Sequence, residues 1–400
     1  MKIVQTEDFF HPEAGYQINI LSKYLSKFGH DVTVITSKTE KIPDWLTTFF
    51  NIENIEEKDE VYTKNTGVKI IRLPIKKFVS GRAIFTKSLK KCINELNPDI
   101  LYVHGNDTLS AMTFIKKTGR LNYSVITDSH MLEMASVNRL NKLFRLYYRK
   151  FITPKIIKNN LTVIRTQDDD YVNRCLGIPL SQAPWVSYGS DTLIFHPDEQ
   201  IKNDFRRENS ISTDDFVIIY AGKLDSSKGG LLLAETFLKK FNINKNVVLI
   251  VVGNTVGDYG ESVENTFIKS ENRIIRFPTQ KYNDLAKFYQ SSDLCVFAKQ
   301  CSLSFYDAQA CGLPVLSEDN NINTDRCSHK NGWNFRSDNT EDFRDKIEMI
   351  LNINPEEYKN YSNNAYKYIT ENYDYEIKSR EYERILQNAC DRFNDLKHKR

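Results

Sequence analysis

The 400-residue chain has only seven cysteines, an odd number, and none of them form a Cys-x-x-Cys pair. Scattered cysteines argue against a disulfide framework and a structural zinc site, and they indicate a reducing compartment. No apolar run approaches the roughly 18 residues of a membrane span, and the first residues lack the apolar core of a signal peptide. A cytoplasmic protein without a membrane span is therefore expected.

The chain also has little excess charge of either sign, because its formal net charge is only +3. The charge is unevenly divided, however. Residues 1–190 carry 27 Lys and Arg against 19 Asp and Glu, whereas the rest of the chain carries 28 against 33. A basic first half suits phosphate-bearing partners or an anionic membrane surface. A lysine-rich solvated surface explains the same excess equally well.

The chain begins with a β-loop-α-β pattern. Residues 2–5 form a short apolar strand pattern, apolar residues recur at helical spacing until Gly29, and residues 31–36 form a second strand pattern. Such a unit predicts a parallel sheet with a right-handed crossover. Gly15 opens the helix where backbone could approach a ligand, although the dinucleotide fingerprint Gly-x-Gly-x-x-Gly is absent.

Strand patterns recur through the first half, at residues 68–73, 100–103, 124–127, 161–164 and 185–188. Residues 38–66, with Trp45 and Phe49-Phe50, are expected to form an excursion at the sheet edge. Alternating strands and helices predict an open α/β sheet with ligands at the carboxyl ends of its strands. Polar loops follow three of those ends, at Gly15, at His104-Gly-Asn106 and at Asp128-Ser-His130.

Residues 136–153 form a basic amphipathic pattern that Pro154 ends. Leu140, Leu143, Phe144, Tyr147 and Phe151 share one helical face, and Arg139, Lys142, Arg145, Arg149 and Lys150 lie mostly off it. A helix of this kind can touch a lipid interface or a lipid-diphosphate acceptor. It can equally be an ordinary helix packed on its sheet.

The second half restarts the αβ pattern with a strand at residues 216–221 and a loop, Gly222-Lys-Leu-Asp-Ser-Ser-Lys-Gly-Gly. Lys223 and Lys228 can bracket a diphosphate, and Gly229-Gly230 lets the backbone approach it. Without that context the two would be ordinary surface lysines. Further strand patterns predict a second doubly wound domain, and the chain from about residue 338 onward is helical.

The most informative stretch is Ser304-Phe-Tyr-Asp-Ala-Gln-Ala-Cys-Gly-Leu-Pro-Val315. Ser304 suits an N-cap with Asp307 three residues later, and Gly312 with Pro314 suits a helix end. A loop entering a helix N-terminus offers free N–H groups and roughly half a positive charge to an anion. This stretch and the paired-lysine loop together indicate a nucleoside diphosphate site.

These motifs resemble those of the family-four retaining glycosyltransferases, which have the GT-B fold. The resemblance covers most of the chain: His11-Pro-Glu-Ala-Gly15, residues 29–36, Val186–Pro197, Tyr220–Gly229 and Asp307–Val315. It implies an α/β fold of two Rossmann-like, doubly wound domains that face each other across a cleft, with a helical C-terminus. The implied boundaries are 1–190 for an acceptor-side domain, 191–375 for a nucleotide-sugar-binding domain, and 376–400 for a C-terminal helix that could cross back to the first domain.

The resemblance also implies roles for individual residues. Asp307 would accept hydrogen bonds from the donor ribose, and Lys223 and Lys228 would neutralise the diphosphate. The donor would also be contacted by Ser302, Leu303 and Ser304 and, from the first domain, by Gly15. The base would be contacted by Phe277 and Pro278. His130 would contact the transferring sugar. The family needs no cofactor and no metal. Asp168-Asp-Asp170 matches an Asp-x-Asp metal pattern, but a surface helix beginning there explains it better.

Three departures from the family pattern concern the donor site. An arginine normally stands at Lys223, a glutamate at Asp307, and another glutamate at Lys299, where it contacts the sugar ring. The loop before Asp307 is about three residues short. Lys299 or Cys301 could have taken over the sugar contact, so the sequence leaves the donor sugar open.

The function expected from the sequence is transfer of a sugar, with retention, from a nucleoside diphosphate, UDP in first place, to a glycan or lipid-linked saccharide acceptor for surface-glycan synthesis. The protein would act in the cytoplasm or peripherally at the inner face of the membrane, and no nucleic acid would be bound. Two alternatives stay open: a non-catalytic GT-B subunit that binds a partner glycosyltransferase, and a nucleotide-sugar epimerase.

Overall fold

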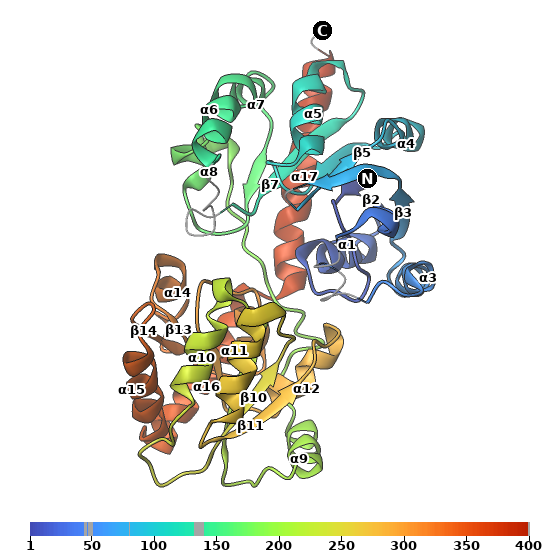
Figure 1. Ribbon diagram of the computed structural model, residues 1–400. Helices are drawn as coiled ribbons and strands as arrows, with labels where there is room; N and C mark the ends of the chain where they lie inside the picture. The colour runs from blue at the N-terminus through green and yellow to red at the C-terminus, as the bar shows by residue number, and fades with distance from the viewer. Residues whose placement is uncertain (44–45, 47–50, 80, 132–139, 399–400) are drawn as a thin grey trace. The chain divides into compact units, whose positions relative to one another are not determined.

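The computed structural model describes residues 1–43, 46, 51–79, 81–131 and 140–398, and two compact units share the chain (Figure 1). Unit 1 is Met1–Tyr188 with Tyr375–Arg400, and unit 2 is Gly189–Asp374. Trp45, Phe49, Phe50 and Arg139, which the sequence analysis singled out, lie outside the described residues.

Unit 1 is built on a six-stranded sheet in the order β3-β2-β1-β6-β7-β8, and every pair in it is parallel. Its strands are β1 (Lys2–Thr6), β2 (Asp31–Ser37), β3 (Lys69–Leu73), β6 (Ile100–Val103), β7 (Ser124–Ser129) and β8 (Val163–Arg165). A separate antiparallel hairpin consists of β4 (Ile75–Val79) and β5 (Arg82–Phe85).

Helices cover both faces of this sheet, as the alternation of strand side chains requires. Ile3 of β1 packs with α1 and α17, whereas the next residue, Val4, packs with α4, α5, α6 and α7. The helices of unit 1 are α1 (Gln17–Lys27), α3 (Ile55–Thr66), α4 (Ser88–Leu96), α5 (Leu109–Lys117), α6 (Asn141–Phe151), α7 (Thr153–Lys158), α8 (Tyr171–Arg174) and α17 (Tyr375–His398), with short 3₁₀ turns at Thr39–Lys41, Thr118–Arg120 and Leu180–Gln182.

Unit 2 repeats the architecture in the order β11-β10-β9-β12-β13-β14, again with parallel pairs. Its strands are β9 (Phe216–Ala221), β10 (Val247–Val252), β11 (Arg273–Phe277), β12 (Leu294–Phe297), β13 (Val315–Glu318) and β14 (Gly332–Phe335). Its helices are α9 (Glu199–Glu208), α10 (Gly230–Thr236), α11 (Gly257–Ile268), α12 (Ala286–Gln290), α13 (Ser304–Ala310), α14 (Asn321–Arg326), α15 (Thr340–Leu351) and α16 (Pro355–Asn372), with 3₁₀ turns at Ser226–Lys228 and Asn283–Leu285.

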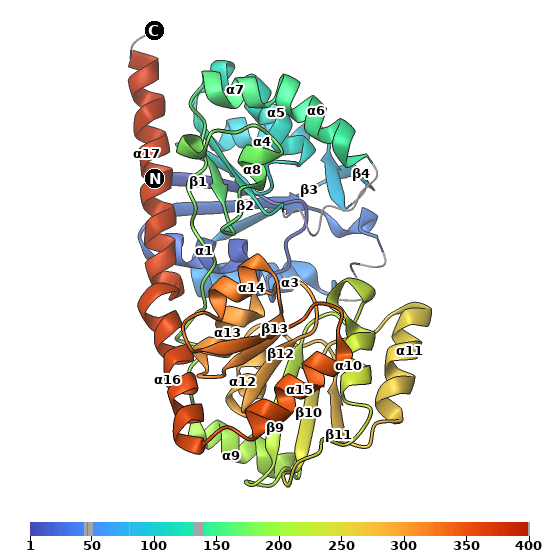
Figure 2. The ribbon, with the colours of Figure 1, turned by 90° about the vertical axis from the view of Figure 1, so that its left-hand side faces the viewer.

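The long helix α17 belongs to unit 1, although α16, just before it in the chain, belongs to unit 2. Tyr375 stacks on Tyr24 of α1, and the Tyr382 hydroxyl donates to the carbonyl of Val186 at 3.0 Å. Figure 2 shows α17 running along the side of β1 and β2. Its apolar face closes the core on the α1 side of the sheet.

The two Rossmann-like domains expected from the sequence are confirmed, as is the helical C-terminus. The strand expected at residues 185–188 is wrong: only an isolated bridge joins Arg165 to Trp185. Pro184, which lacks an N–H donor, precedes that bridge, and its carbonyl accepts from Arg165. Among the described residues, no helix combines the length and the hydropathy needed to cross a membrane.

The basic helix predicted over 136–153 is observed as α6, but its buried side differs from the expected stripe. Tyr148 is fully buried, whereas Leu140, Leu143 and Leu146 remain 67%, 65% and 63% exposed. Apolar and aromatic residues occupy most of the turns of this segment, so helical spacing alone could not tell which side faces the core.

Candidate functional site

The paired-lysine loop of unit 2 connects β9 to α10. The Asp225 carboxylate accepts from the Lys228 N–H at 3.0 Å and holds the turn at Ser226–Lys228. Gly229 has φ +71°, and a Cβ there would lie only 3.0 Å from Cβ of Lys299. The glycine therefore lets this loop lie against the end of β12, as a close backbone approach requires.

Lys228 joins the loop to the second predicted feature. Its ammonium donates to the carbonyl of Cys301 at 2.9 Å, just before the predicted contact residues Ser302–Ser304. Burial lowers the pKa of Lys228, because a desolvated cation is less stable. An incoming anion would restore a counter-charge at this ammonium. Lys223, five residues earlier, is partly buried on the same loop.

The 302–304 loop enters α13, a helix of seven residues. Ser304 is not its N-cap, which corrects the sequence expectation: the N-cap is Leu303, and the Ser302 hydroxyl accepts from the Ser304 N–H at 3.3 Å. At the other end the expectation is confirmed. Gly312 has φ +76° and donates to the carbonyl of Gln309, as a glycine just past a helix end does.

Arg326 is a third cation at this loop, and no sequence motif indicated it. It lies at the end of α14, donates to the Ser302 carbonyl at 3.0 Å, and places its guanidinium 4.8 Å from the centre of the Tyr306 ring. Only 3% of the residue is exposed. Arg326 thus adds a fixed positive charge beside the loop that Lys228 reaches.

Asp307 lies one turn into α13 and is buried. Its Oδ1 accepts from the Ser190 hydroxyl at 2.7 Å and from the Tyr282 hydroxyl at 3.1 Å. Burial raises the pKa of Asp307 to about 7, and the two hydrogen bonds oppose that rise. No described residue donates to Oδ2. The carboxyl group is therefore oriented at one oxygen and can accept from ligand hydroxyls at the other.

The structure shows what surrounds Lys299, which stands where the related family carries a glutamate. The Lys299 ammonium pairs with the exposed Asp338 at 2.6 Å, and Gln300 takes a left-handed conformation with φ +59°. The Gln300 N–H donates to the carboxylate of Glu318 at 2.7 Å. An acidic group is thus present beside the loop, supplied by the end of the neighbouring strand β13 rather than by the loop itself.

The predicted base-binding segment is tied to the loop after β10. The Phe277 carbonyl accepts from the Gly253 N–H at 3.0 Å, and the Asn254 side chain accepts from the Thr279 N–H at 3.0 Å. The ring of Phe277 packs on Phe288 in an aromatic cluster, whereas Pro278 is exposed. Only backbone groups and Pro278 could therefore meet a base here.

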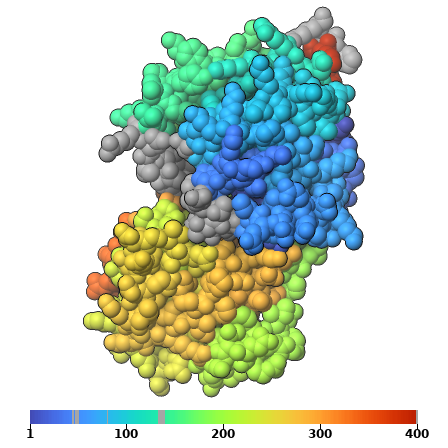
Figure 3. Space-filling model, turned by 45° about the vertical axis from the view of Figure 1, so that its right-hand side comes forward, coloured from blue at the N-terminus to red at the C-terminus, as the bar shows by residue number. Residues whose placement is uncertain are grey.

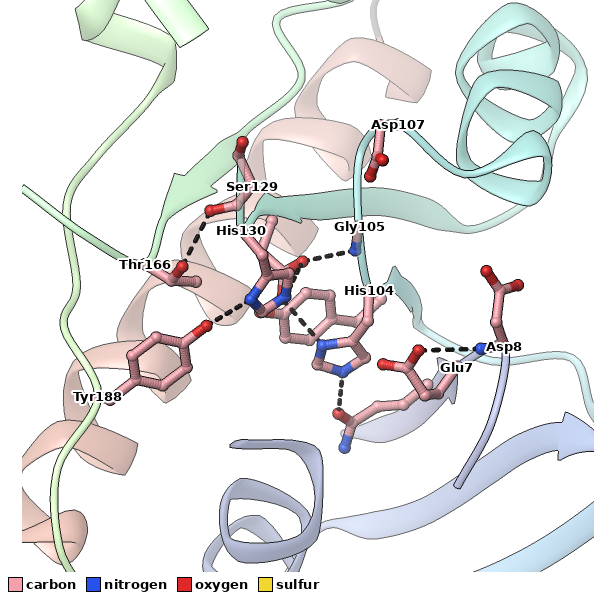
Figure 4. A network of polar contacts seen from close by, with 12 residues as sticks. Glu7, Asp8, His104, Gly105, Asp107, Ser129, His130, Thr166 and Tyr188 are labelled. Atoms are coloured by element: carbon pink, nitrogen blue, oxygen red, sulfur yellow. Dashed lines mark hydrogen bonds and ion pairs between the residues drawn. The ribbon is translucent and has the colours of Figure 1, made fainter. Parts of the chain in front are cut away.

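In unit 1, His104, Gly105 and His130 follow β6 and β7 and lie close together (Figure 4). All three hydrogen-bond to the buried carboxylate of Asp128. It accepts from the Tyr102 hydroxyl at 2.7 Å, the Gly105 N–H at 2.7 Å, and His104 and His130 at 2.9 Å each. Burial alone would raise the pKa of Asp128, but the two histidines outweigh it and hold the pKa well below its usual range.

His130 is the predicted sugar-contacting residue of this network. Its other ring nitrogen, Nδ1, lies within hydrogen-bonding distance of the Tyr188 hydroxyl, and 38% of its side chain is exposed. Burial lowers the pKa of His130, but Asp128 outweighs that effect, so the pKa is raised above its usual value. His130 is thus held at the carboxyl edge of the sheet by Asp128 at one ring nitrogen and Tyr188 at the other.

The same three residues, His104, Asp128 and His130, bring their potential metal-ligand atoms within 4.8 Å of one another. Hydrogen bonds account for that proximity, because each Asp128 oxygen already accepts from one imidazole. The Asp168–Asp170 run has a structural role instead: the Asp169 carboxylate accepts from the Tyr171 N–H at 2.6 Å, and Asp170 pairs with Arg174.

Two acids at the end of β1 were missed by the sequence analysis. Glu7 lies beside His104 in Figure 4, and burial raises its pKa. Burial and the neighbouring Glu7 raise the pKa of Asp8 to about 7. Gly15 lies further along the same loop, two residues before α1 begins. The position of Glu7 and Asp8 directly after a strand could have indicated that they lie at the ligand-binding edge of the sheet.

The predicted site residues thus fall into two groups. Lys228 and Ser302–Ser304 are brought together in unit 2, with Asp307 one turn further along α13. Lys223 shares the loop of Lys228, and Phe277 and Pro278 follow β11 in the same unit. Gly15 and His130 belong to unit 1.

Comparisons with known proteins match this chain to sugar-transferring enzymes. The model of the family "Glycosyl transferases group 1" matches residues 201–368. D-inositol 3-phosphate glycosyltransferase of Segniliparus rotundus is 28% identical over 140 residues, which are 33% of this chain and 30% of that protein. The match thus spans less than a third of that relative.

Solved structures match over nearly the whole chain. A glycosyltransferase from Rickettsia africae superposes with a TM-score of 0.74 at 15% identity, covering 97% of this chain and 98% of that one. Anabaena Alr3699/HepE in complex with UDP and glucose has a TM-score of 0.72 at 14% identity, covering 97% and 100%. These likenesses confirm the GT-B fold expected from the sequence.

Proposed function

We propose that this chain, whose residues 201–368 match the model of the family "Glycosyl transferases group 1", transfers a sugar from a nucleoside diphosphate to an acceptor hydroxyl with retention. The observation that carries the proposal is the meeting of Lys228, the 302–304 loop and Arg326 in unit 2, with Asp307 one turn further along α13. With Lys223 on the same loop, these groups would offer three cations to the diphosphate and an acid to the ribose.

The proposed mechanism rests on charge. Lys223, Lys228 and Arg326 stabilise the negative charge that grows on the departing diphosphate, in a setting where they are already oriented. Asp307 holds the ribose hydroxyls, and His130 contacts the transferring sugar. No protein nucleophile is required when the acceptor attacks from the face that the diphosphate leaves, assisted by a phosphate oxygen.

UDP is the proposed nucleotide, because a protein of the same fold, Alr3699/HepE, has been solved with UDP and glucose. Pro278 and the backbone of residues 277–279 would meet the uracil edge. The reaction is proposed to need no cofactor and no resident metal, since the three cations supply the positive charge that a divalent ion would otherwise bring.

The direct test is thermal stabilisation of the purified protein by a panel of nucleotides and sugar nucleotides. A ligand present at 100 times its dissociation constant adds about 2.7 kcal/mol to the free energy of unfolding. We expect the largest shift with UDP or a UDP-sugar, and release of UDP when an acceptor is added.

Two other outcomes would favour the alternatives. Nucleotide binding without turnover, followed by activity when a second protein is added, would make the chain a non-catalytic partner subunit. Conversion of a sugar nucleotide into its epimer without any acceptor would make it an epimerase. A complete absence of shifts would contradict the donor site itself.

Peripheral contact with a membrane is a second proposal, and the exposed side of α6 supports it. Leu140, Leu143 and Leu146 are each more than 60% exposed, Phe151 is 49% exposed, and basic residues such as Lys142 and Lys150 accompany them. Apolar side chains flanked by cations suit an anionic lipid interface. The acceptor would then be a lipid-linked saccharide at the inner face of a membrane.

The variant Leu143→Ser/Leu146→Ser is expected to weaken binding to phosphatidylglycerol vesicles about tenfold or more, since it removes two apolar anchors. Sedimentation with vesicles would measure this. Ile268→Ser, at a residue 79% exposed in unit 2, is the matched control. Arg145 and Arg149 are poorer targets, because their guanidinium groups donate to Tyr171 and to the Arg174 carbonyl. Unchanged vesicle binding of the double variant would contradict the proposal.

A further inference from the structure

A groove of about 810 Å³ lies in unit 1 between the β4–β5 hairpin, α4 and α5. Figure 3 shows the side of unit 1 whose blue-to-cyan surface is formed by this part of the chain. The groove is lined by five lysines and one acid, which are Lys76, Lys87, Lys90, Lys91, Lys117 and Glu95. No predicted site residue belongs to it.

The positive charge of the groove is largely uncompensated. Glu95 pairs with Lys91 at 3.7 Å, one helical turn away. Within the described chain, no carboxylate lies within ion-pairing distance of Lys76, Lys87, Lys90 or Lys117. Like charges gathered in a concave surface repel one another, and they concentrate anions from solution.

Two helix N-termini add to this charge. Both α4 and α5 begin at the groove, and neither has an acid in its first turn. Lys87 occupies the N-cap of α4 and Lys90 its first turn, although the helix dipole disfavours cations there. Asp107, just before α5, is occupied by Arg82 at 2.5 Å. An anion in the groove would offset the repulsion among the lysines and the unfavourable position of Lys87 and Lys90 at the N-terminus of α4.

The walls are apolar as well as basic. Leu109 is 46% exposed at the start of α5, and Phe85, Leu89 and Phe114 also line the groove. A simple inorganic ion would leave these side chains unused. A ligand that joins phosphate groups to an apolar or sugar moiety would contact both kinds of surface.

The groove adjoins the loop that follows β6. Leu109, which lines the groove, comes five residues after His104 in the chain, and Arg82 of the hairpin pairs with Asp107 between them. A molecule in the groove would thus lie close to the Arg82–Asp107 pair, two residues from the start of α5.

We propose that this groove binds the phosphate groups of the acceptor, which is therefore a phosphate-linked or diphosphate-linked lipid or saccharide. The inference rests on the proposed transferase function, but it names a property that the donor site does not determine. Lys87, Lys90 and Lys117 are the phosphate-binding residues, and Leu109 with Phe85 contacts the adjoining apolar part.

The test is calorimetric titration of the full chain with geranyl diphosphate, using inorganic pyrophosphate and geraniol as partial probes. We expect geranyl diphosphate to bind more tightly than either partial probe. In Lys87→Gln/Lys90→Gln, its dissociation constant should rise tenfold or more. Lys64→Gln, on exposed α3 of the same unit, is the matched control. The melting temperature of the double variant should not fall, since the substitutions remove cations from a helix N-terminus.

Two arms separate the possible sources of the signal. Binding must survive Lys223→Ala/Lys228→Ala, because those lysines serve the donor; loss there alone would mean that the probe occupies the donor site and would overturn the proposal. Phosphatidylglycerol vesicles that bind through Lys87 and Lys90, while geranyl diphosphate does not bind, would assign the groove to lipid headgroups and overturn it too. If geranyl diphosphate bound equally well to Lys87→Gln/Lys90→Gln and to the original protein while the UDP shift was retained, only this inference, and not the donor site, would have failed.

Discussion

The variant Lys223→Ala/Lys228→Ala is expected to lose about 10³-fold in kcat/KM for sugar transfer. Removing a single preoriented donor to a developing negative charge typically costs roughly 10²- to 10³-fold, and neighbouring groups do not add fully. The loss corresponds to about 4 kcal/mol of transition-state stabilisation. Initial rates over a range of donor concentrations would separate the effect on kcat from that on KM.

Matched variants make this expectation specific. Lys239→Ala removes an exposed lysine of the same unit and should leave the rate unchanged. Lys223→Arg keeps a cation at the position where the related family carries arginine, and it should retain most activity. A rate for the double alanine variant within tenfold of the original would contradict the role of both lysines and would leave Arg326 as the main cation.

The sequence predicted the fold well, because the pattern of a parallel sheet is local. Continuous apolar strands such as residues 247–252, each followed by a helical pattern, identify strands buried on both faces. The β4–β5 hairpin was not predicted. Its strands are short, and the adjacent Lys76 and Lys77 break the alternation of polar and apolar residues that would have indicated the first of them.

The candidate site was predicted in part, and the boundary between success and failure has a physical reason. Residues within one loop or one helix start, such as Lys228 and Ser302, could be inferred from turn chemistry. Arg326 and Glu318 could not, since they reach the same loop from α14 and β13 through tertiary packing. The partners of Asp307, Ser190 and Tyr282, are likewise distant in sequence.

The same argument explains the unexpected orientation of α6. Periodicity identified an amphipathic helix, but Tyr148 is buried in the core whereas Leu143 and Leu146 are exposed. Which side of a helix is buried depends on the shape of the sheet beneath it. That information is absent from the segment itself.

Asp307→Asn is expected to stabilise the protein at pH 8 while removing most of its affinity for the donor. Burial raises the pKa of Asp307 to about 7 from its usual 3.8. Between these two pH values the folded state keeps a proton on Asp307 that the unfolded state has lost. The free energy of unfolding therefore falls as the pH rises from the lower value through the upper one. Asparagine avoids burying a charge, so the gain at pH 8 is up to about 4 kcal/mol, and it vanishes below pH 4.

Donor binding should show the opposite sign, because the ionised carboxylate is the better acceptor for ribose hydroxyls. UDP affinity of the original protein should rise as the pH increases through 7, whereas Asp307→Asn should bind UDP roughly 100-fold more weakly at pH 8, with a flat pH profile. Calorimetry with UDP and thermal melts at pH 5, 7 and 8 would measure both effects. Asp284→Asn, at an exposed acid of the same unit, should change neither. If Asp307→Asn kept the affinity and its pH dependence, ribose binding would have to be assigned to another residue, and the stability gain alone would mark Asp307 as a buried structural acid.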